Sequence, residues 1–256
     1  MNLNAMAFDN VTPDPDALRK LREDLAACFR AAADLGFSEG VCNHFSAVVP
    51  GNDNLFVVNP FGLAFDEIRA SDLLVCDYDG NVLLGEGEPE DTAFFIHSRL
   101  HKLVPRARVA FHTHMPYATA LSMVEGPPLK WAGQNALRFY GRTLVDEDYN
   151  GLALDNSEGD RIANSIGDAD VVFMRNHGVM VIGNSVAEVW DDLYYLERAC
   201  EAQVIAESTG RRLVPVSPEV AAATYKQTRG VGTGLSEAHL ASVRRGLDRA
   251  GSDYAV

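Results

Sequence analysis

Four short apolar runs between residues 44 and 84 limit the possible folds of this chain more than any other feature of its sequence. The runs cover residues 45–50, 55–58, 73–76 and 82–84. Gly, Asn and Asp residues at 51–54 and 79–81 separate them as turns, which is typical of antiparallel strands. Strand-like runs return farther along, at 108–114, 170–174 and 179–182. The sequence therefore predicts a central, mostly antiparallel sheet.

Helical patterns surround these strands. Apolar residues recur three and four positions apart from Asp16 to Gly36, which predicts one amphipathic helix. Further helices are expected from Asp91 or Thr92 to about Leu103, from Pro116, from Ser185 to about Ser208, after Ser217, and from Ser236 to about Arg249. Residues 126–158 indicate loops and short strands. Because no repeat or linker interrupts the 256 residues, we expect one α/β domain over 1–256.

The charge balance excludes several kinds of partner. The formal net charge of -14 disfavours binding to nucleic acid or to anionic lipid, since both need clustered Lys and Arg. Cys28, Cys42, Cys76 and Cys200 are scattered, which predicts neither a disulfide framework nor a cysteine metal site. Residues 1–10 lack the basic and apolar regions of a signal peptide, so the expected location is cytoplasmic.

A His-x-His pair at the end of a predicted strand indicates a metal site. Residues two apart on a strand share a face, so His112 and His114 should project together. Pro116 ends the strand just beyond them. His177 lies in a predicted turn between two apolar strands, beside Gly178, and is the expected third ligand. Three neutral histidines leave open positions on a divalent ion for water or substrate.

The remaining histidines have weaker indications. His97 and His101 lie four apart on one helix, where they could also bind a metal, but packing or surface roles are favoured. His44 precedes a strand and is a candidate for contact with a substrate. His239 is expected at the surface of the last helix.

The motifs around these histidines resemble the class II aldolase/adducin family. The resemblance rests on the run 109–120, on Met174-Arg-Asn-His-Gly178, on Val58-Asn-Pro-Phe-Gly62 and on Phe95-Ile-His-Ser98. It extends over a core of about 18–209 and leaves 210–256 as a C-terminal helical extension. It implies a three-layer α/β/α sandwich and commonly a homotetramer. It also implies a divalent ion, expected to be Zn²⁺ with Fe²⁺ or Mn²⁺ as alternatives, held by the histidines that match here, His112, His114 and His177.

Two departures from the family pattern bear on the reaction and substrate. The aldolases place a catalytic Glu at the position of Ala93, and alanine cannot move a proton. Their phosphate-binding serine pair falls on Asp91 and Thr92, and a carboxylate there would repel a phosphate. Three candidate substrate-binding residues remain, namely Asn43, Ser46 and Gly62. The sequence therefore predicts a non-phosphorylated substrate and a different proton carrier, for which Tyr117, Tyr140, His44 and Asp91 are the candidates.

Three functions are compatible with this pattern. The first is a metal-dependent lyase that cleaves or decarboxylates a small hydroxy- or oxo-acid or a sugar-derived carbonyl compound. The second is a non-haem Fe(II) oxygenase that uses the same histidines. The third is a non-catalytic, adducin-like interaction module, which the lost Glu favours and the retained histidines disfavour. Tyr225, Arg229 and the glycines at 230–234 form either a mobile lid or a plain surface loop.

Overall fold

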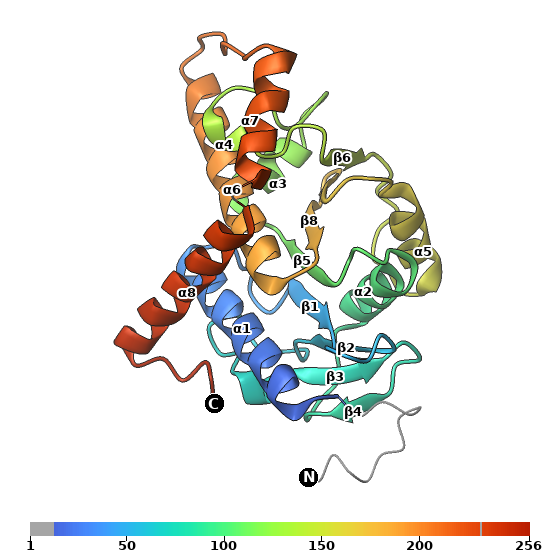
Figure 1. Ribbon diagram of the computed structural model, residues 1–256. Coiled ribbons are helices and arrows are strands. Elements are labelled where there is room, and N and C mark those ends of the chain that lie inside the picture. Colours follow the sequence, from blue (N-terminus) through green and yellow to red (C-terminus); the bar gives the residue numbers. More distant parts are fainter. Residues whose placement is uncertain (1–12, 231) are drawn as a thin grey trace.

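An eight-stranded sheet forms the centre of the molecule in the computed structural model, which describes residues 13–230 and 232–256, without the side chains of 232 and 233 (Figure 1). The strand order is β4-β3-β2-β1-β5-β8-β7-β6. The strands are β1 (His44–Val48), β2 (Leu55–Val58), β3 (Leu74–Asp77), β4 (Val82–Leu84), β5 (Val109–Thr113), β6 (Thr143–Asp146), β7 (Val171–Met174) and β8 (Gly178–Gly183). Among these, β6 and β7 pair in parallel and the other neighbours are antiparallel, as predicted. The predicted lack of a signal peptide concerns residues 1–10, which lie outside the described residues.

Helices cover both faces of the sheet. They are α1 (Pro15–Asp34), α2 (Asp91–Leu103), α3 (Pro116–Ser122), α4 (Gln134–Leu137), α5 (Asn156–Ser165), α6 (Val186–Ser208), α7 (Pro218–Gly230) and α8 (Gly232–Ala250), with a 3-10 turn, η2 (Ala70–Asp72). Figure 1 shows α2 and α5 on one side of the sheet and α1, α6 and α8 on the other. The predicted three-layer α/β/α sandwich is therefore confirmed.

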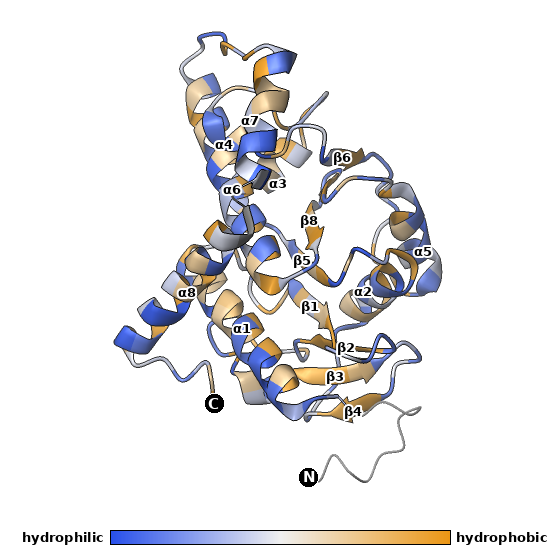
Figure 2. Ribbon diagram, in the orientation of Figure 1, coloured by the Kyte–Doolittle hydropathy of each residue, from blue (hydrophilic) through white to orange (hydrophobic). Residues whose placement is uncertain are grey.

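Alternation along the strands divides the core between the two faces. In β5, Val109 and Phe111 join the larger apolar cluster beneath α1, α3 and α6. Ala110 joins the smaller cluster with Ile96 of α2 and Ile162 of α5. Figure 2 shows β3 and β4 in hydrophobic colours and hydrophilic stretches along α1 and α8. Because His112 alternates with Phe111, its side chain lies on the α2 side of the sheet.

The sequence predicted loops and short strands over residues 126–158. This prediction was wrong at α4 and at 156–158, where α5 begins, whereas β6 is a short strand as predicted. Gly159 is unfavourable within a helix, which is one reason that the pattern was missed. The structure explains the glycine, because a Cβ there would lie 2.1 Å from the carbonyl oxygen of Phe95 and 2.8 Å from Arg99. Gly159 thus permits close packing of α5 on α2.

Two predicted helix starts also need correction. The N-cap of α2 is Glu90, whose carboxylate accepts a 2.8 Å hydrogen bond from Ala93 N, so neither Asp91 nor Thr92 caps this helix. The last helix begins at Gly232 rather than Ser236. Residues 225–230 and 232–234 are therefore helical, so the expected plain loop does not match the described part of this segment, and residue 231 lies outside the described residues. Arg229 is held by an ion pair to Glu188 at 2.8 Å.

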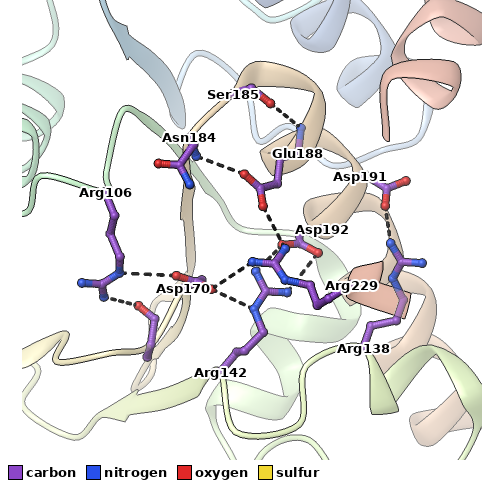
Figure 3. A network of polar contacts seen from close by, with 11 residues as sticks. Arg106, Arg138, Arg142, Asp170, Asn184, Ser185, Glu188, Asp191, Asp192 and Arg229 are labelled. Carbon is purple, nitrogen blue, oxygen red and sulfur yellow. Dashed lines mark hydrogen bonds and ion pairs between the residues drawn. The ribbon is translucent and has the colours of Figure 1, made fainter. Parts of the chain in front are cut away.

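A polar network joins the sheet edge to α6 and α7 (Figure 3). Arg142, 4% exposed, precedes β6 and forms ion pairs with Asp170 at 2.8 Å and with Asp192 at 2.6 Å. Arg106 and Arg229 also approach Asp170, at 3.4 Å and 3.9 Å. This network holds the starts of β6 and β7 against α6 and α7.

The state of the cysteines and the character of the helices bear on the predictions made from composition. The four cysteines are free. None of the helices in the described ranges combines the length and the apolar character needed to cross a bilayer.

Candidate metal centre

The structure brings together the three histidines that the sequence predicted as metal ligands. His112 lies in β5, His114 just past its end, and His177 in the turn between β7 and β8. Antiparallel pairing of β5 with β8 places Thr113 opposite Val179. The turn before β8, which contains His177, therefore lies at the end of β5. One nitrogen of each ring lies within 4.8 Å of the others.

Residues on either side of His177 allow the turn to approach β5. Asn176 has the left-handed φ of 58° and makes the turn, a backbone conformation that asparagine tolerates. Gly178 was expected to make it, but this residue begins β8. Its lack of a side chain matters in another way, because a Cβ would lie 2.6 Å from Thr113 O and 2.8 Å from the His114 ring.

Hydrogen bonds to the outer nitrogens define how the ligand rings are protonated. The carbonyl of Val179, 2.9 Å from His112 Nδ1, accepts a hydrogen bond from it. The carboxylate of Glu39 accepts one from His114 Nδ1. A neutral imidazole carries one N–H, so each of these rings in its neutral form, which is the form that binds a metal, has an unprotonated Nε2. These two atoms are 3.2 Å apart, and two lone pairs at that distance repel each other unless a cation lies between them.

Burial keeps two of the ligand histidines neutral. Burial and the neighbouring His114 together lower the pKa of His177 to about 4. Burial also lowers the pKa of His112 well below its usual value. Metal ions bind the neutral form of imidazole, so at neutral pH His112 and His177 need no deprotonation before an ion binds. The donor set therefore fits a divalent ion.

A cavity of about 270 Å³ opens beside the three histidines. Its apolar walls come from segments next to β1 and β2, from the end of β7, from α2 and α5, and from the loop between β6 and α5. They include Val41, Phe61, Ile96, Leu152, Ile162 and Met174. The loop between β6 and α5 covers one side, and the ring of Tyr149 lies 6.2 Å from that of His177. The site can therefore enclose a small organic molecule next to the ion.

Two predicted substrate or catalytic residues, Asn43 and His44, line this cavity. Asn43 is buried and has a left-handed φ of 79°, a strained conformation that often marks a functional position. Its Oδ1 accepts a hydrogen bond from His114 N, whereas its Nδ2 makes no hydrogen bond to a described residue. The Nδ2 donor of Asn43 is therefore buried without a hydrogen-bond partner among the described residues.

The other predicted residues do not line the cavity. Gly62 and Asp91 are exposed at its periphery. Tyr117 packs against the apolar cluster on the opposite face of the sheet, and Tyr140 packs on Trp131 with ring centroids 5.2 Å apart. Ser46 is fully buried and bonded to two histidine rings, so it is not available to a substrate within this chain.

The remaining histidines are more buried than their sequence pattern suggested. His97 is inaccessible and His101 is 7% exposed, so both have the packing role that was favoured and neither lies at the surface. His239, in α8, is half-buried rather than exposed, because its ring packs against Tyr194 of α6 and bonds to Asp191 at 2.8 Å. The described metal-ligand cluster does not include His97 and His101.

The buried His101 leads to a pH-dependent stability. Burial lowers its pKa from 6.5 to about 4, and it also lowers the pKa of His97 well below its usual value. The unfolded chain therefore takes up protons below about pH 6.5 that the folded chain does not bind. We expect the free energy of unfolding of metal-free protein to fall between pH 6.5 and pH 4. Urea unfolding across this range should show a shallower fall for His101→Gln, and equal slopes would contradict the assignment.

Several residues of the site had no recognisable sequence signal. Glu39 is far from the histidine motifs in sequence and has no pattern around it. The loop residues Tyr149 and Leu152 lie in a segment without clear periodicity. Glu90 and Thr92 line the cavity and bond to each other. Their only signal in the sequence was that this chain departs from the family pattern near Ala93.

Comparison with known proteins agrees with this architecture. The family model of the Class II Aldolase and Adducin N-terminal domain matches residues 23–204. An aldolase II superfamily protein from Pseudomonas syringae superposes with a TM-score of 0.88 at 35% identity, over 97% of this chain and 98% of that one. The chain therefore belongs to the class II aldolase/adducin family.

One further solved structure shares the fold, and one further protein is similar in sequence. An L-fuculose 1-phosphate aldolase from Glaciozyma antarctica shares the fold with a TM-score of 0.79 at 24% identity, over 98% and 97% of the two chains. A 4-hydroxy-3-prenylphenylpyruvate oxygenase/4-hydroxy-3-prenylbenzoate synthase from Streptomyces roseochromogenus is 30% identical over 79% of this chain and 73% of its own length.

Proposed function

We propose that this protein is a divalent-metal-dependent lyase that acts on a small, non-phosphorylated hydroxy- or oxo-acid or a related carbonyl compound. The observation that supports it most directly is the convergence of three histidine rings, with the Nε2 atoms of His112 and His114 3.2 Å apart beside His177. A bound divalent ion would supply Lewis-acid polarisation of a substrate oxygen. A non-catalytic scaffold has no use for such a centre at the end of an enclosed cavity.

The charges around the cavity support a substrate without phosphate. Four carboxylates line it, those of Glu90, Asp146, Asp148 and Glu158. Its two arginines are already paired, Arg161 with Asp146 at 2.7 Å and Arg175 with Glu147 at 2.8 Å. A phosphate dianion held away from the ion would meet repulsion without a free cationic side chain to bind it, whereas the single negative charge of a hydroxy- or oxo-acid lies next to its reacting oxygen and would be balanced by the divalent ion.

The test is turnover by reconstituted protein. Protein stripped with a chelator and reloaded separately with Zn²⁺, Mn²⁺ or Fe²⁺ should release aldehyde or carbon dioxide from members of a panel of hydroxy- and oxo-acids. The stripped protein should be inactive and should recover when metal is returned. If no metal restores cleavage of any panel member, the lyase proposal is wrong.

A second function is favoured by one relative, the prenylphenylpyruvate oxygenase. Three histidines without an acidic ligand also suit Fe(II) with open positions for oxygen and substrate. For this alternative, protein purified without chelator should contain iron and consume oxygen only when an oxo-acid is present. Stoichiometric zinc without oxygen uptake would exclude it.

We also propose that the chain forms a homo-oligomer, for which a tetramer is the family expectation. Phe61 and Leu152, at the mouth of the cavity, are 65% and 71% exposed. Apolar side chains grouped in this way are typical of surfaces that another subunit covers.

A further inference from the structure

The two arginines that line the metal cavity are already bound to other groups of the chain. Each nitrogen of the Arg161 guanidinium donates a hydrogen bond, to Asp146 at 2.7 Å and to Glu158 at 2.6 and 3.0 Å. Each nitrogen of Arg175 likewise donates, to a carboxylate and to two backbone carbonyls. Among the described residues of the cavity wall, no other arginine and no lysine is present. The positive charge left for a ligand is therefore that of the ion.

Most of the carboxylates of the cavity wall are engaged as well. Two of them pair with Arg161, and that of Glu90 accepts a hydrogen bond from Ala93 N at the start of α2. Asp148 is exposed, on the loop between β6 and α5. A ligand tail with several hydroxyl groups or a second charge would therefore lose water in the cavity without gaining equal partners.

The inner wall of the cavity is part of the hydrophobic core. Ile96, Ile162 and Met174 line it from α2, from α5 and from the end of β7. All three belong to the smaller apolar cluster, and each is at most 6% exposed. Because packing fixes these side chains on their other sides, the wall is firm and apolar and does not adapt to a polar tail.

The loop between β6 and α5 supplies the opposite wall. Tyr149 lines the cavity from this loop and is 55% exposed. Its ring lies edge-on to that of His177, with centroids 6.2 Å apart, so the apolar part of the side chain is next to the ion site. An exposed aromatic ring at the side of a cavity gains stability when a ligand covers it.

We propose that the cavity selects a monocarboxylic hydroxy- or oxo-acid with an uncharged, apolar tail, which Tyr149 covers against the wall of Ile96 and Met174. The proposal rests on the proposed function and narrows its substrate class, because it excludes dicarboxylic acids and sugar-derived compounds. The ion balances the single carboxylate, and the apolar walls take the tail out of water. The volume of about 270 Å³ limits the tail to a short alkyl chain or one aromatic ring, since drug-sized ligands occupy cavities of about 300–1,000 Å³.

Calorimetric titration of the full chain, loaded with Zn²⁺, tests this selectivity with lactate, 2-hydroxyhexanoate and gluconate. The three acids share a 2-hydroxy-acid head group and differ in the tail. 2-Hydroxyhexanoate should bind about tenfold more tightly than lactate or better, because each methylene fully removed from water strengthens binding about fourfold. Gluconate has the same chain length with a polar tail and should bind no more tightly than lactate. Equal affinities for 2-hydroxyhexanoate and lactate, tighter binding of gluconate, or no binding of any acid would overturn the proposal.

A matched pair of variants on one loop tests the contact with Tyr149. Tyr149→Ser should lower the affinity for 2-hydroxyhexanoate about fivefold and leave that for lactate nearly unchanged, because only the longer tail is covered by the ring. Leu154→Ser removes a similarly exposed side chain, 64% accessible, that does not line the cavity, and should change neither affinity. Equal effects of the two variants would refute the role of Tyr149.

These experiments measure binding and not turnover, so the two proposals can fail separately. A protein that prefers the apolar tail but cleaves no acid would refute the lyase function alone. A protein that cleaves acids with polar tails and shows no such preference would refute the apolar selectivity alone.

Discussion

His112→Ala is expected to remove the metal from this protein while leaving the chain folded. His112 is one of three ligands whose rings contact one another in pairs, with centroids 4.8, 4.9 and 5.0 Å apart. Its loss leaves two imidazoles, too few for the usual site with three protein ligands. After dialysis against a limiting concentration of metal, elemental analysis should find close to one ion per wild-type chain and almost none in the variant.

Two further variants separate a metal site from a general effect of histidine loss. Glu39→Gln weakens the hold on His114 Nδ1 without removing a ligand, so the metal affinity should fall about 10–100-fold. His239→Ala removes a half-buried histidine on α8 and should retain the full metal content. If His112→Ala bound metal as the wild type does, the assignment of all three ligands would be wrong.

The ligand trio could be predicted from the sequence because local geometry produces it. A strand places His112 and His114 on one side, and a short turn between paired strands places His177 at the neighbouring strand end. The fold was predictable for the same reason: the runs at 55–58 and 82–84 and the long helix after Ser185 follow periodicities that depend only on nearby residues.

The rest of the site depends on contacts between distant segments, which no local pattern encodes. Glu39 reaches His114 across 75 positions of the sequence, and Ser46 reaches His101 across 55. Ser46 bonds to histidines instead of facing a substrate because α2 packs on β1. Helix α5 was missed because Gly159 serves its packing on α2 and lowers its own helical propensity.

The largest expected loss of stability away from the metal comes from Arg142→Met. Arg142 is 4% exposed and binds Asp192 through two nitrogens, at 2.6 and 3.3 Å, and Asp170 through Nε at 2.8 Å (Figure 3). Methionine matches much of the side-chain volume but leaves the Asp192 carboxylate buried and unpaired. Removing one partner of a buried ion pair costs about 3–5 kcal/mol, and we expect the free energy of unfolding to fall by that amount.

A matched surface pair distinguishes burial from charge. Arg108 pairs with Asp53 at 2.6 Å, but the Asp53 side chain is 80% exposed, so Arg108→Met should cost about 1 kcal/mol or less. Arg142→Met combined with Asp192→Leu should recover part of the lost stability, because no buried charge then remains at position 192. Urea unfolding of metal-free proteins at pH 7 measures all three variants. Equal losses for the Arg142 and Arg108 variants would show that the network contributes no more to stability than an exposed ion pair. The position of β6 and β7 would then depend on the apolar packing of Val171 and Phe173.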